Sequence, residues 1–481
     1  MRLMEFLKAQ GPKAACLAGE QEGGVPLMIA VMLVCLVALP ASASAYYLDV
    51  ARGDDGNPGT SAEKAWRTLD KANAALVSGD TCLLRAGVYA DSQIAPARSG
   101  APGAPITYAA YPGESPEITG GKSGSIVNLE QRSYVVVRGL KIHSPTEHDW
   151  VVRISGEQAQ RNRVERCDIT DPEGYAPVVI AEKACYNTIV ECTVHDTGHG
   201  EEGSGDCIVL NEGAHHNTVT RNKCYNGCHS QIMAINGSSH NVIADNEMYA
   251  TNRAWAGAGV NLGLDSSSNL VVGNRIHDLG YITDQKCAIQ VGTAHNLLQN
   301  NVVYNVGAFG ISLQSYPYDG HRQEAVGNLV ANNTVANCGR QPLLILSKVD
   351  CISRDNRIAS NIVVGSPRDW YDIHAWVMVF DTYHLTQPAA PGRWFGNVFE
   401  NNVLFHSRPG EPGMVLYSHK GGTATWSVPE LETEFGESYR GNIEADPQFT
   451  DPLRGDFRLK PNSPIAGGGI GAAMGHRGSD R

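Results

Sequence analysis

The sequence predicts an all-β repeat protein that is built from stacked coils. A short motif, Asn-x-apolar-x-x-[Asn/Cys]-x-apolar, recurs about every 29 residues. A second run of β-forming residues precedes most copies of this motif. Charged residues make up 18% of the 481 residues, and 52 residues are glycine. This composition is typical of a chain with many turns and few long amphipathic helices.

The motif predicts a stacked apolar core and a ladder of asparagines. Its first asparagine is Asn162, Asn187, Asn217, Asn241, Asn269, Asn296, Asn328, Asn356 or Asn397. Equivalent positions of successive coils would lie at the ~4.8 Å spacing of neighbouring strands, so that inward Val, Ile and Leu residues stack on one another. An asparagine at a tight turn can take the αL conformation and can bond its equivalent in the next coil.

The runs that precede the motifs predict one further strand in each coil. They are bounded by Gly, Ser or Asp, as in CIVLN (207–211), GVNLGL (259–264) and AIQVG (288–292). Each period therefore holds about three short strands. Eight residues after the first asparagines lies a row that we expect to stack on the exterior of one strand: Thr170, His195, Tyr225, Tyr249, His277 and Tyr304.

These stacked turns resemble bacterial secreted proteins of the pectate lyase superfamily. The resemblance covers residues 126–406, and the segments 51–91 and 445–469 resemble the opening and closing segments of such proteins. It implies a single-stranded right-handed parallel β-helix (solenoid) of about nine to eleven coils, with N- and C-terminal caps. The expected organisation is a signal peptide (1–45), a cap with the first coils (46–125), the β-helix (126–410) and a C-terminal capping segment (411–481).

The N-terminal segment predicts export. Residues 26–39 form an apolar run that is short for a membrane span, and Ala43-Ser44-Ala45 follows the small-x-small rule for cleavage, which places the mature start near Tyr46. The alternative is an uncleaved N-terminal anchor. We therefore expect a secreted, periplasmic or cell-surface protein and a monomer. The net charge of −12 argues against nucleic acid or an anionic membrane as partner. It would also repel a polyanion unless a bound cation or a local basic patch intervened.

The positions of the cysteines in the repeat predict that they are small side chains buried in the core. Cys167 and Cys192 take the second asparagine position of the motif in neighbouring coils, and Cys224 takes an inward position. Neighbouring coils also bring Cys167 and Cys192 within disulfide range, which remains the alternative. The spacing of Cys224 and Cys228 does not favour a zinc site.

The superfamily resemblance implies a substrate groove along the strand that precedes the motif and the loop that leads into it. Amide and aromatic side chains suit sugar hydroxyls and ring faces, and Ser312 and Asp265 are further polar residues expected on this face. The expected substrate-binding residues are His199, Asn211, Asn261, Gln290, Gln314 and Tyr316. The alternative is an ordinary solvated sheet face.

A lyase that acts on a uronate-containing polysaccharide by β-elimination is the favoured activity. The substrate carboxylate must be neutralised by Lys, Arg or Ca²⁺, and a base must then remove the C5 proton. The expected Ca²⁺ ligands are Glu201, Glu202, Asp206 and Asp265. The expected catalytic residues are Lys286, which is the preferred base, Arg253, His229 and Asp206.

Two other classes of function remain open. A glycoside hydrolase needs two carboxylates about 5–9.5 Å apart, for which Glu202 or Asp206 could pair with Asp265 or Asp284. The motif set of the polygalacturonase relatives is incomplete, because the GHG tripeptide at 198–200 lies in a loop and NTD and RIK are missing. The third class is a non-catalytic surface or carbohydrate-binding β-helix, since this fold hosts many functions.

Overall fold

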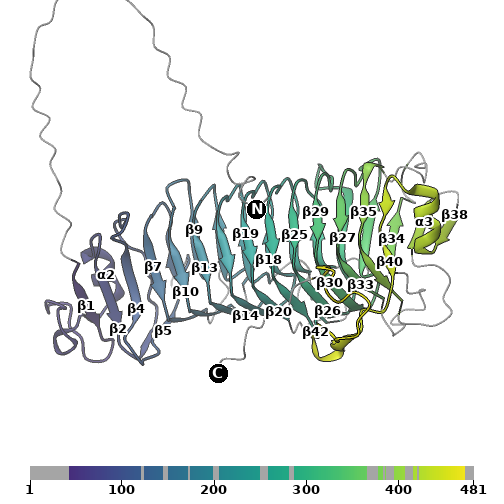
Figure 1. Ribbon diagram of the computed structural model, residues 1–481. Coiled ribbons are helices and arrows are strands. Elements are labelled where there is room, and N and C mark those ends of the chain that lie inside the picture. Colours follow the sequence, from purple (N-terminus) through teal and green to yellow (C-terminus); the bar gives the residue numbers. More distant parts are fainter. Residues whose placement is uncertain are drawn as a thin grey trace, which may run out of the picture. The chain divides into compact units, whose positions relative to one another are not determined.

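A computed structural model describes the chain, and all its described residues belong to one compact unit, Ser42–Arg481. The described residues are 43–120, 124–144, 150–171, 174–198, 205–249, 258–280, 287–365, 377–382, 385, 395–406, 415–419 and 422–471. The strands form three long parallel sheets, here called A, B and C, and successive coils follow one another from β1 to β40 (Figure 1). The fold is a parallel β-solenoid, as the sequence predicts.

Sheet A contains 14 strands, and it begins at the first described strand. They are β1 (Ala45–Leu48), β2 (Thr81–Leu84), β4 (Ile106–Ala110), β7 (Val135–Arg138), β10 (Arg163–Glu165), β13 (Thr188–Val190), β16 (Thr218–Thr220), β19 (Val242–Ala244), β22 (Leu270–Val272), β25 (Leu297–Gln299), β29 (Leu329–Ala331), β32 (Arg357–Ala359), β35 (Val398–Glu400) and β39 (Tyr439–Arg440). The nine motif copies form the nine strands from β10 to β35.

Sheet B contains 13 strands, each of which follows a strand of sheet A. They are β3 (Val88–Tyr89), β5 (Glu117–Thr119), β8 (Lys141–His143), β11 (Asp168–Asp171), β14 (Thr193–Thr197), β17 (Lys223–Gly227), β20 (Glu247–Tyr249), β23 (Arg275–His277), β26 (Val302–Val306), β30 (Thr334–Cys338), β33 (Ile362–Val364), β36 (Val403–Phe405) and β40 (Ile443–Glu444).

Sheet C is formed by the runs that precede the motifs. Its strands are β6 (Val127–Asn128), β9 (Val152–Ser155), β12 (Val178–Ala181), β15 (Ile208–Leu210), β18 (Ser230–Ala234), β21 (Ala258–Leu262), β24 (Cys287–Val291), β27 (Phe309–Tyr318), β28 (His321–Gln323), β31 (Leu343–Ser347), β34 (Met378–Asp381), β37 (Val415–His419) and β38 (Gly422–Trp426). Of these 13 strands, β28 and β38 pair antiparallel, which leaves 11 parallel strands.

Two asparagine ladders join the coils, one at each asparagine position of the motif. In the first ladder, the backbone N–H and the side-chain amide of Asn217 both donate to Oδ1 of Asn241, at 2.9 and 3.1 Å. In the second ladder, Asn246 donates to Oδ1 of Asn274 in the same two ways, both at 3.0 Å. These side chains are buried, so each ladder satisfies polar groups that the turns would otherwise leave unpaired.

The positive φ angle belongs to the residue before each ladder asparagine, which corrects the expectation that the asparagine itself takes the αL conformation. His216 (φ 55°) precedes Asn217, and Asp245 (φ 57°) precedes the second-ladder Asn246. The turn is made by the preceding residue because the asparagine side chain must point inward and along the stack to reach its neighbour.

The cysteines at the ladder position extend the second ladder without forming a disulfide. Cys167 and Cys192 are both free and buried. The backbone N–H of Cys192 donates to Oδ1 of Asn222 at 2.9 Å, and its thiol donates to the carbonyl of Val164 at 3.6 Å. Cys224 is fully buried in the core, as predicted.

The predicted aromatic row stacks on the outer face of sheet B. Ring centroids lie 4.7 Å apart for His195 and Tyr225, 5.2 Å for Tyr225 and Tyr249, 5.3 Å for Tyr249 and His277, and 4.9 Å for His277 and Tyr304. Carboxylates flank the histidines, because both ring nitrogens of His195 and of His277 contact an Asp or Glu. The row therefore combines ring stacking with hydrogen bonds between histidines and carboxylates.

We expect the row to make stability depend on pH through Glu247. Its hydrogen bond with His277 lowers the pKa of Glu247 below the ordinary value of 4.5. A carboxylate with a lowered folded pKa stabilises the protein above its unfolded pKa, and this contribution is lost as the pH falls through the folded pKa. Glu247→Gln should therefore lower the thermal midpoint at pH 6, and the difference from the wild type should shrink as the pH falls below 4.5 and through the lowered pKa of Glu247. A difference that is constant over this range would contradict the prediction.

Short elements close both ends of the described stack. Near the N-terminus lie the 3₁₀ helix η1 (Ala62–Lys64) and α2 (Leu69–Ala75), whose first turn is capped by the Thr68 hydroxyl. Near the C-terminus, α3 (Val428–Phe435) begins with a capping box between Ser427 and Glu430, and it packs against β39. This helix lies within the segment 411–481 that is expected to cap the C-terminal end.

The closing segment turns back onto the outer face of sheet B. It consists of β41 (Phe449–Asp451), the 3₁₀ helix η3 (Pro452–Arg454) and β42 (Asp456–Leu459). Phe457 stacks edge-on against Tyr304 at 5.1 Å. Gly455 has a φ of 76°, and a Cβ there would lie 2.5 Å from the Tyr304 hydroxyl, so this approach requires glycine.

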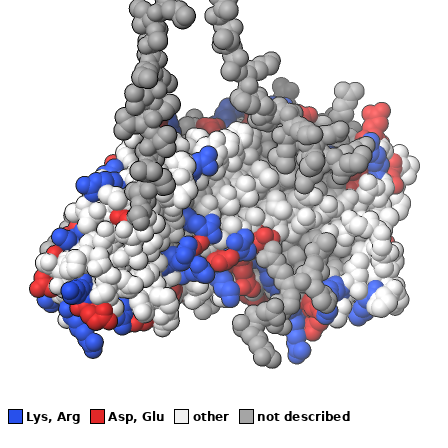
Figure 2. Space-filling view, turned by 60° about the vertical axis from the view of Figure 1, so that its left-hand side comes forward, with Lys and Arg blue, Asp and Glu red and all other residues white. Residues whose placement is uncertain are grey.

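The described helices are too short or too polar to cross a membrane. Charged side chains are spread unevenly over the face shown in Figure 2, where Lys and Arg alternate with Asp and Glu in the middle and along the lower edge.

Candidate functional site

The outer face of sheet C is more apolar than the sequence predicts for a sugar-binding face. Its central row follows the register Val179, Val209, Met233, Asn261, Gln290 and Ser312. The first three form a buried apolar cluster with Ala176 and Ala181. Asn261 and Gln290 are partly exposed, whereas Ser312 is buried. The polar and reachable part of this row therefore lies on β21 and β24.

A buried carboxylate and a histidine meet where β15 and β18 begin. Asp206 lies just before β15, and His229 lies just before β18, so the parallel register brings them to the same edge of sheet C. Nδ1 of His229 lies 3.0 Å from Oδ1 of Asp206. The Asp206 side chain is fully buried, and that of His229 is 21% exposed.

This arrangement fixes the tautomer of His229 when the ring is neutral. The carboxylate can only accept a hydrogen bond, so Nδ1 donates, and Nε2 keeps its lone pair free to take a proton. The second oxygen of Asp206, Oδ2, is buried and has no hydrogen-bond partner among the described residues. An oriented imidazole that is partly exposed is a candidate general base.

Tyr175 lies against this pair and was not anticipated from the sequence. The backbone N–H groups of Gly205 and Asp206 both donate to its carbonyl, at 2.9 and 3.0 Å. Tyr175 is 45% exposed, but partial burial of its phenol raises the pKa to about 12, and the charges of Asp206 and Tyr318 add to this rise. The phenol therefore stays protonated at neutral pH and can donate a hydrogen bond.

A β-hairpin from β27 and β28 folds back over the same face. In this hairpin Tyr316 pairs with Gln323 and Tyr318 pairs with His321. The tight turn between them is Asp319-Gly320, and both residues have positive φ. An Asp-Gly pair between β-forming residues is a strong hairpin signal, so this element could have been predicted.

The hairpin reaches two earlier coils. The Gln290 side-chain amide donates to the Tyr316 hydroxyl at 3.2 Å, and the Leu264 backbone N–H donates to the Gln323 side chain at 3.2 Å. Burial raises the pKa of Tyr316, although its hydrogen bonds to Gln323 and Gln290 oppose the rise. Asn261 and Gln290 thus lie on the part of the outer face between the apolar cluster and the hairpin, whose Tyr316 contacts Gln290.

Other predicted binding residues have different surroundings. Asn211 is partly exposed and accepts a hydrogen bond from Asn236 at 2.8 Å, in the turn after β15. Gln314 is only 6% exposed, and its amide donates to the Cys287 thiol at 3.2 Å, so it is covered rather than open to a ligand. His199 lies outside the described residues, as do Glu201, Glu202, Arg253 and Lys286.

The structure does not bring Asp206 and Asp265 together. Asp265 follows the C-terminal end of β21, two coils from β15, and its neighbour is His321 at 3.3 Å. From strand geometry the two carboxylates are separated by on the order of 20 Å, too far to share a cation or to flank one glycosidic bond. Within the described part of the chain, no three His, Cys, Asp or Glu side chains are placed to hold a metal ion.

Comparison with known proteins agrees with this architecture. Residues 46–231 match the family model described as Pel9A-like, right handed beta helix region. An uncharacterized protein of Bacillus subtilis (strain 168), YwoF, is 25% identical over 480 aligned positions, covering 87% of this chain and 92% of that protein.

Two solved structures show the same fold at low sequence identity. A PL6 family polysaccharide lyase from Pseudopedobacter saltans aligns with a TM-score of 0.55 and 16% identity, covering 84% of this chain and 97% of that one. A GH136 lacto-N-biosidase from Eubacterium ramulus aligns with a TM-score of 0.50 and 14% identity, covering 75% and 68%. The resemblance to pectate lyase-like right-handed β-helices is confirmed, and the fold is shared with polysaccharide lyases and glycosidases.

Proposed function

We propose that this chain is an exported polysaccharide lyase that cleaves a uronate-containing polysaccharide on the outer face of sheet C. The observation that carries the proposal is the pair formed by the buried Asp206 carboxylate and the partly exposed His229 ring. The pair lies at the edge of a face that also carries the accessible amides of Asn261 and Gln290. Amides of this kind suit the hydroxyl groups of a sugar chain.

The proposed chemistry is β-elimination with Nε2 of His229 as base. Nε2 takes the C5 proton, the C5–H electron pair becomes the C4=C5 double bond, and the bond from C4 to the glycosidic oxygen breaks. The leaving oxygen then needs a proton or a hydrogen bond, and we assign this role to the phenol of Tyr175, the residue whose backbone carbonyl binds Gly205 and Asp206. Asp206 holds the ring in the tautomer that leaves Nε2 free.

Neutralisation of the substrate carboxylate is assigned to a cation. Arg253, Lys286 and Ca²⁺ bound through Glu201 and Glu202 are the candidates, and these four residues lie outside the described part of the chain. Asp206 is engaged by His229, so we assign it to the base rather than to a metal ion. In this proposal Ca²⁺, where it binds, withdraws charge from the carboxylate and thereby acidifies the C5 proton.

The test is a panel of polygalacturonate, alginate and neutral polysaccharides, each incubated with and without a chelator. A lyase produces ultraviolet absorbance from the unsaturated uronate, and Ca²⁺ dependence appears as loss of that absorbance with the chelator. New reducing ends without absorbance would establish hydrolysis instead. Neither product across the panel would favour the non-catalytic binding protein.

Matched variants then identify the base. His229→Ala should abolish the ultraviolet absorbance if His229 is the base. Lys286→Ala should still produce this absorbance, but with a higher KM. Loss of activity in Lys286→Ala with full activity in His229→Ala would transfer the role to Lys286. Export is tested separately, by sequencing the N-terminus of the mature protein, which should begin near Tyr46.

A further inference from the structure

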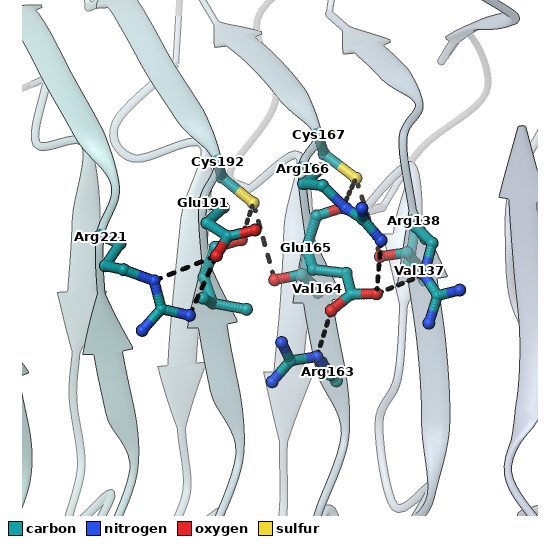
Figure 3. Close-up of polar contacts among 11 residues, drawn as sticks. Val137, Arg138, Arg163, Val164, Glu165, Arg166, Cys167, Glu191, Cys192 and Arg221 are labelled. Carbon is teal, nitrogen blue, oxygen red and sulfur yellow. Dashed lines mark hydrogen bonds and ion pairs between the residues drawn. The ribbon is translucent and has the colours of Figure 1, made fainter. Parts of the chain in front are cut away.

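Three arginines surround one buried glutamate on the outer face of sheet A, away from the candidate site on sheet C. Glu165, at the end of β10, contacts Nε of Arg138 on β7 and Nε of Arg163 on its own strand. Arg166, the next residue along the chain, contacts it at 3.5 Å. Figure 3 shows the Glu165 carboxylate among these side chains. We call Arg138, Arg163, Arg166 and Glu165 the arginine cluster.

The cluster holds its guanidinium groups in place while it leaves them open to solvent. The Glu165 side chain is 6% exposed, whereas those of Arg138, Arg163 and Arg166 are 45%, 39% and 57% exposed. Burial opposes ionisation of Glu165, but hydrogen bonds from Arg163 and Arg138 outweigh it and lower its pKa. Arg138 and Arg163 bind Glu165 through Nε, so their terminal nitrogens are left to face a ligand.

The cluster carries a local excess of positive charge on an acidic protein. Three guanidinium groups against one carboxylate leave a net charge of +2, while the whole chain carries −12. Arg138 and Arg163 also lie on neighbouring coils, whose strands are separated by about 4.8 Å. Arg138 pairs with Glu165 and Arg163 pairs with Val136, so the two arginines lie diagonally across the neighbouring strands and converge on Glu165. Fixed guanidinium groups on one open surface suit the carboxylates of an acidic polymer.

A second cluster of the same design lies in a different electrostatic setting. Glu400 on β35 is buried and contacts Arg357 on β32 and Arg440 on β39. The adjacent helix α3 carries three glutamates, Glu430, Glu432 and Glu434, and it packs against β39. The Glu400 cluster also holds a buried glutamate between arginines, but it has two arginines, whose terminal nitrogens bind the carboxylate, and acidic neighbours, so it serves as the control.

We propose that the arginine cluster is a second, non-catalytic binding surface for an acidic polysaccharide chain. The choice of polyanion rests on the proposed function, since a uronate polymer presents one carboxylate per uronate residue. The cluster would recruit long chains to a protein whose net charge otherwise repels them. Short oligomers that occupy only sheet C would not use it.

The experiment measures binding of labelled polygalacturonate at low and at moderate salt, with a neutral galactan as reference polymer. Because binding is measured directly, the result does not depend on whether the chain cleaves any polysaccharide. The test variant is Arg138→Gln, Arg163→Gln, Glu165→Gln and Arg166→Gln together, which leaves no buried carboxylate without a partner. The control variant is Arg357→Gln, Glu400→Gln and Arg440→Gln. Thermal unfolding verifies that both are folded.

The test variant should bind polygalacturonate roughly tenfold more weakly at low salt and with a smaller salt dependence, while the control changes less than about twofold. If the test variant does not fold, the single variant Arg166→Gln is measured in its place. Its affinity for polygalacturonate should fall about threefold. Unchanged binding in the folded test variant overturns the proposal, as does an equal loss for the neutral galactan. Cluster-dependent binding to phosphatidylserine vesicles without binding to polygalacturonate would overturn it in favour of a membrane surface.

Discussion

Asn274→Ala is expected to lower the free energy of unfolding by roughly 3–5 kcal/mol, because it interrupts the second asparagine ladder in its middle. The Asn274 side chain donates to the carbonyl of Ile243 at 2.9 Å and to Oδ1 of Asn301 at 3.0 Å. It also accepts both hydrogen bonds of Asn246. Asn274 is 1% exposed, so water cannot replace these partners without opening the coil.

The measurement is chemical denaturation followed by circular dichroism. Asn462→Ala is the matched control, because Asn462 is exposed in the closing segment and should change stability by no more than about 0.5 kcal/mol. A loss below about 1 kcal/mol for Asn274→Ala would show that the ladder is incidental to stability. The result is independent of any enzymatic activity.

Asp206→Asn is expected to lower kcat by about 10²- to 10⁴-fold, with a small change in KM. An asparagine amide can donate to Nδ1 of His229, which would place the proton on Nε2 and remove the lone pair that takes the C5 proton. The side chain is fully buried, so the replacement changes the partner of His229 and not a group that touches solvent.

The measurement is initial rate against polysaccharide concentration, with thermal unfolding to verify the fold. Asp91→Asn is a suitable control, since Asp91 is exposed near the N-terminal end and its φ of 50° is one that asparagine tolerates. Full activity of Asp206→Asn would exclude the orienting role, even if His229→Ala were inactive.

The repeat made several features predictable because a solenoid places equivalent residues above one another. The motif alone predicts that Asn217 bonds Asn241 and that Tyr249 stacks on His277, and both contacts occur. The conformation of the turn was predicted less well. The motif shows that the turn needs an asparagine. It does not show that the residue before the asparagine takes the αL conformation, which becomes evident only from the direction of the asparagine side chain.

The candidate site depends on contacts that the period does not encode. Asp206 and His229 were both named from the sequence, but the Nδ1 contact requires the register between β15 and β18. Gln314 was expected in a binding face and is buried, because what covers a face depends on segments from other coils. Tyr175 carries no sequence signal at all, since its importance comes from its place beside Asp206.

The sequence by itself determined the all-β solenoid, its period, the inward apolar stack, the asparagine ladders and the aromatic row. These features follow from local spacing, because each coil adds at a fixed distance to the one before. Only the tertiary structure decided which polar residues converge. It placed Asp206 beside His229, separated Asp206 from Asp265, and set Arg138 and Arg163 around the buried Glu165. The physical reason is that these contacts join residues outside the repeated motif, whose positions depend on the path of each loop and on the register of strands that the motif does not specify.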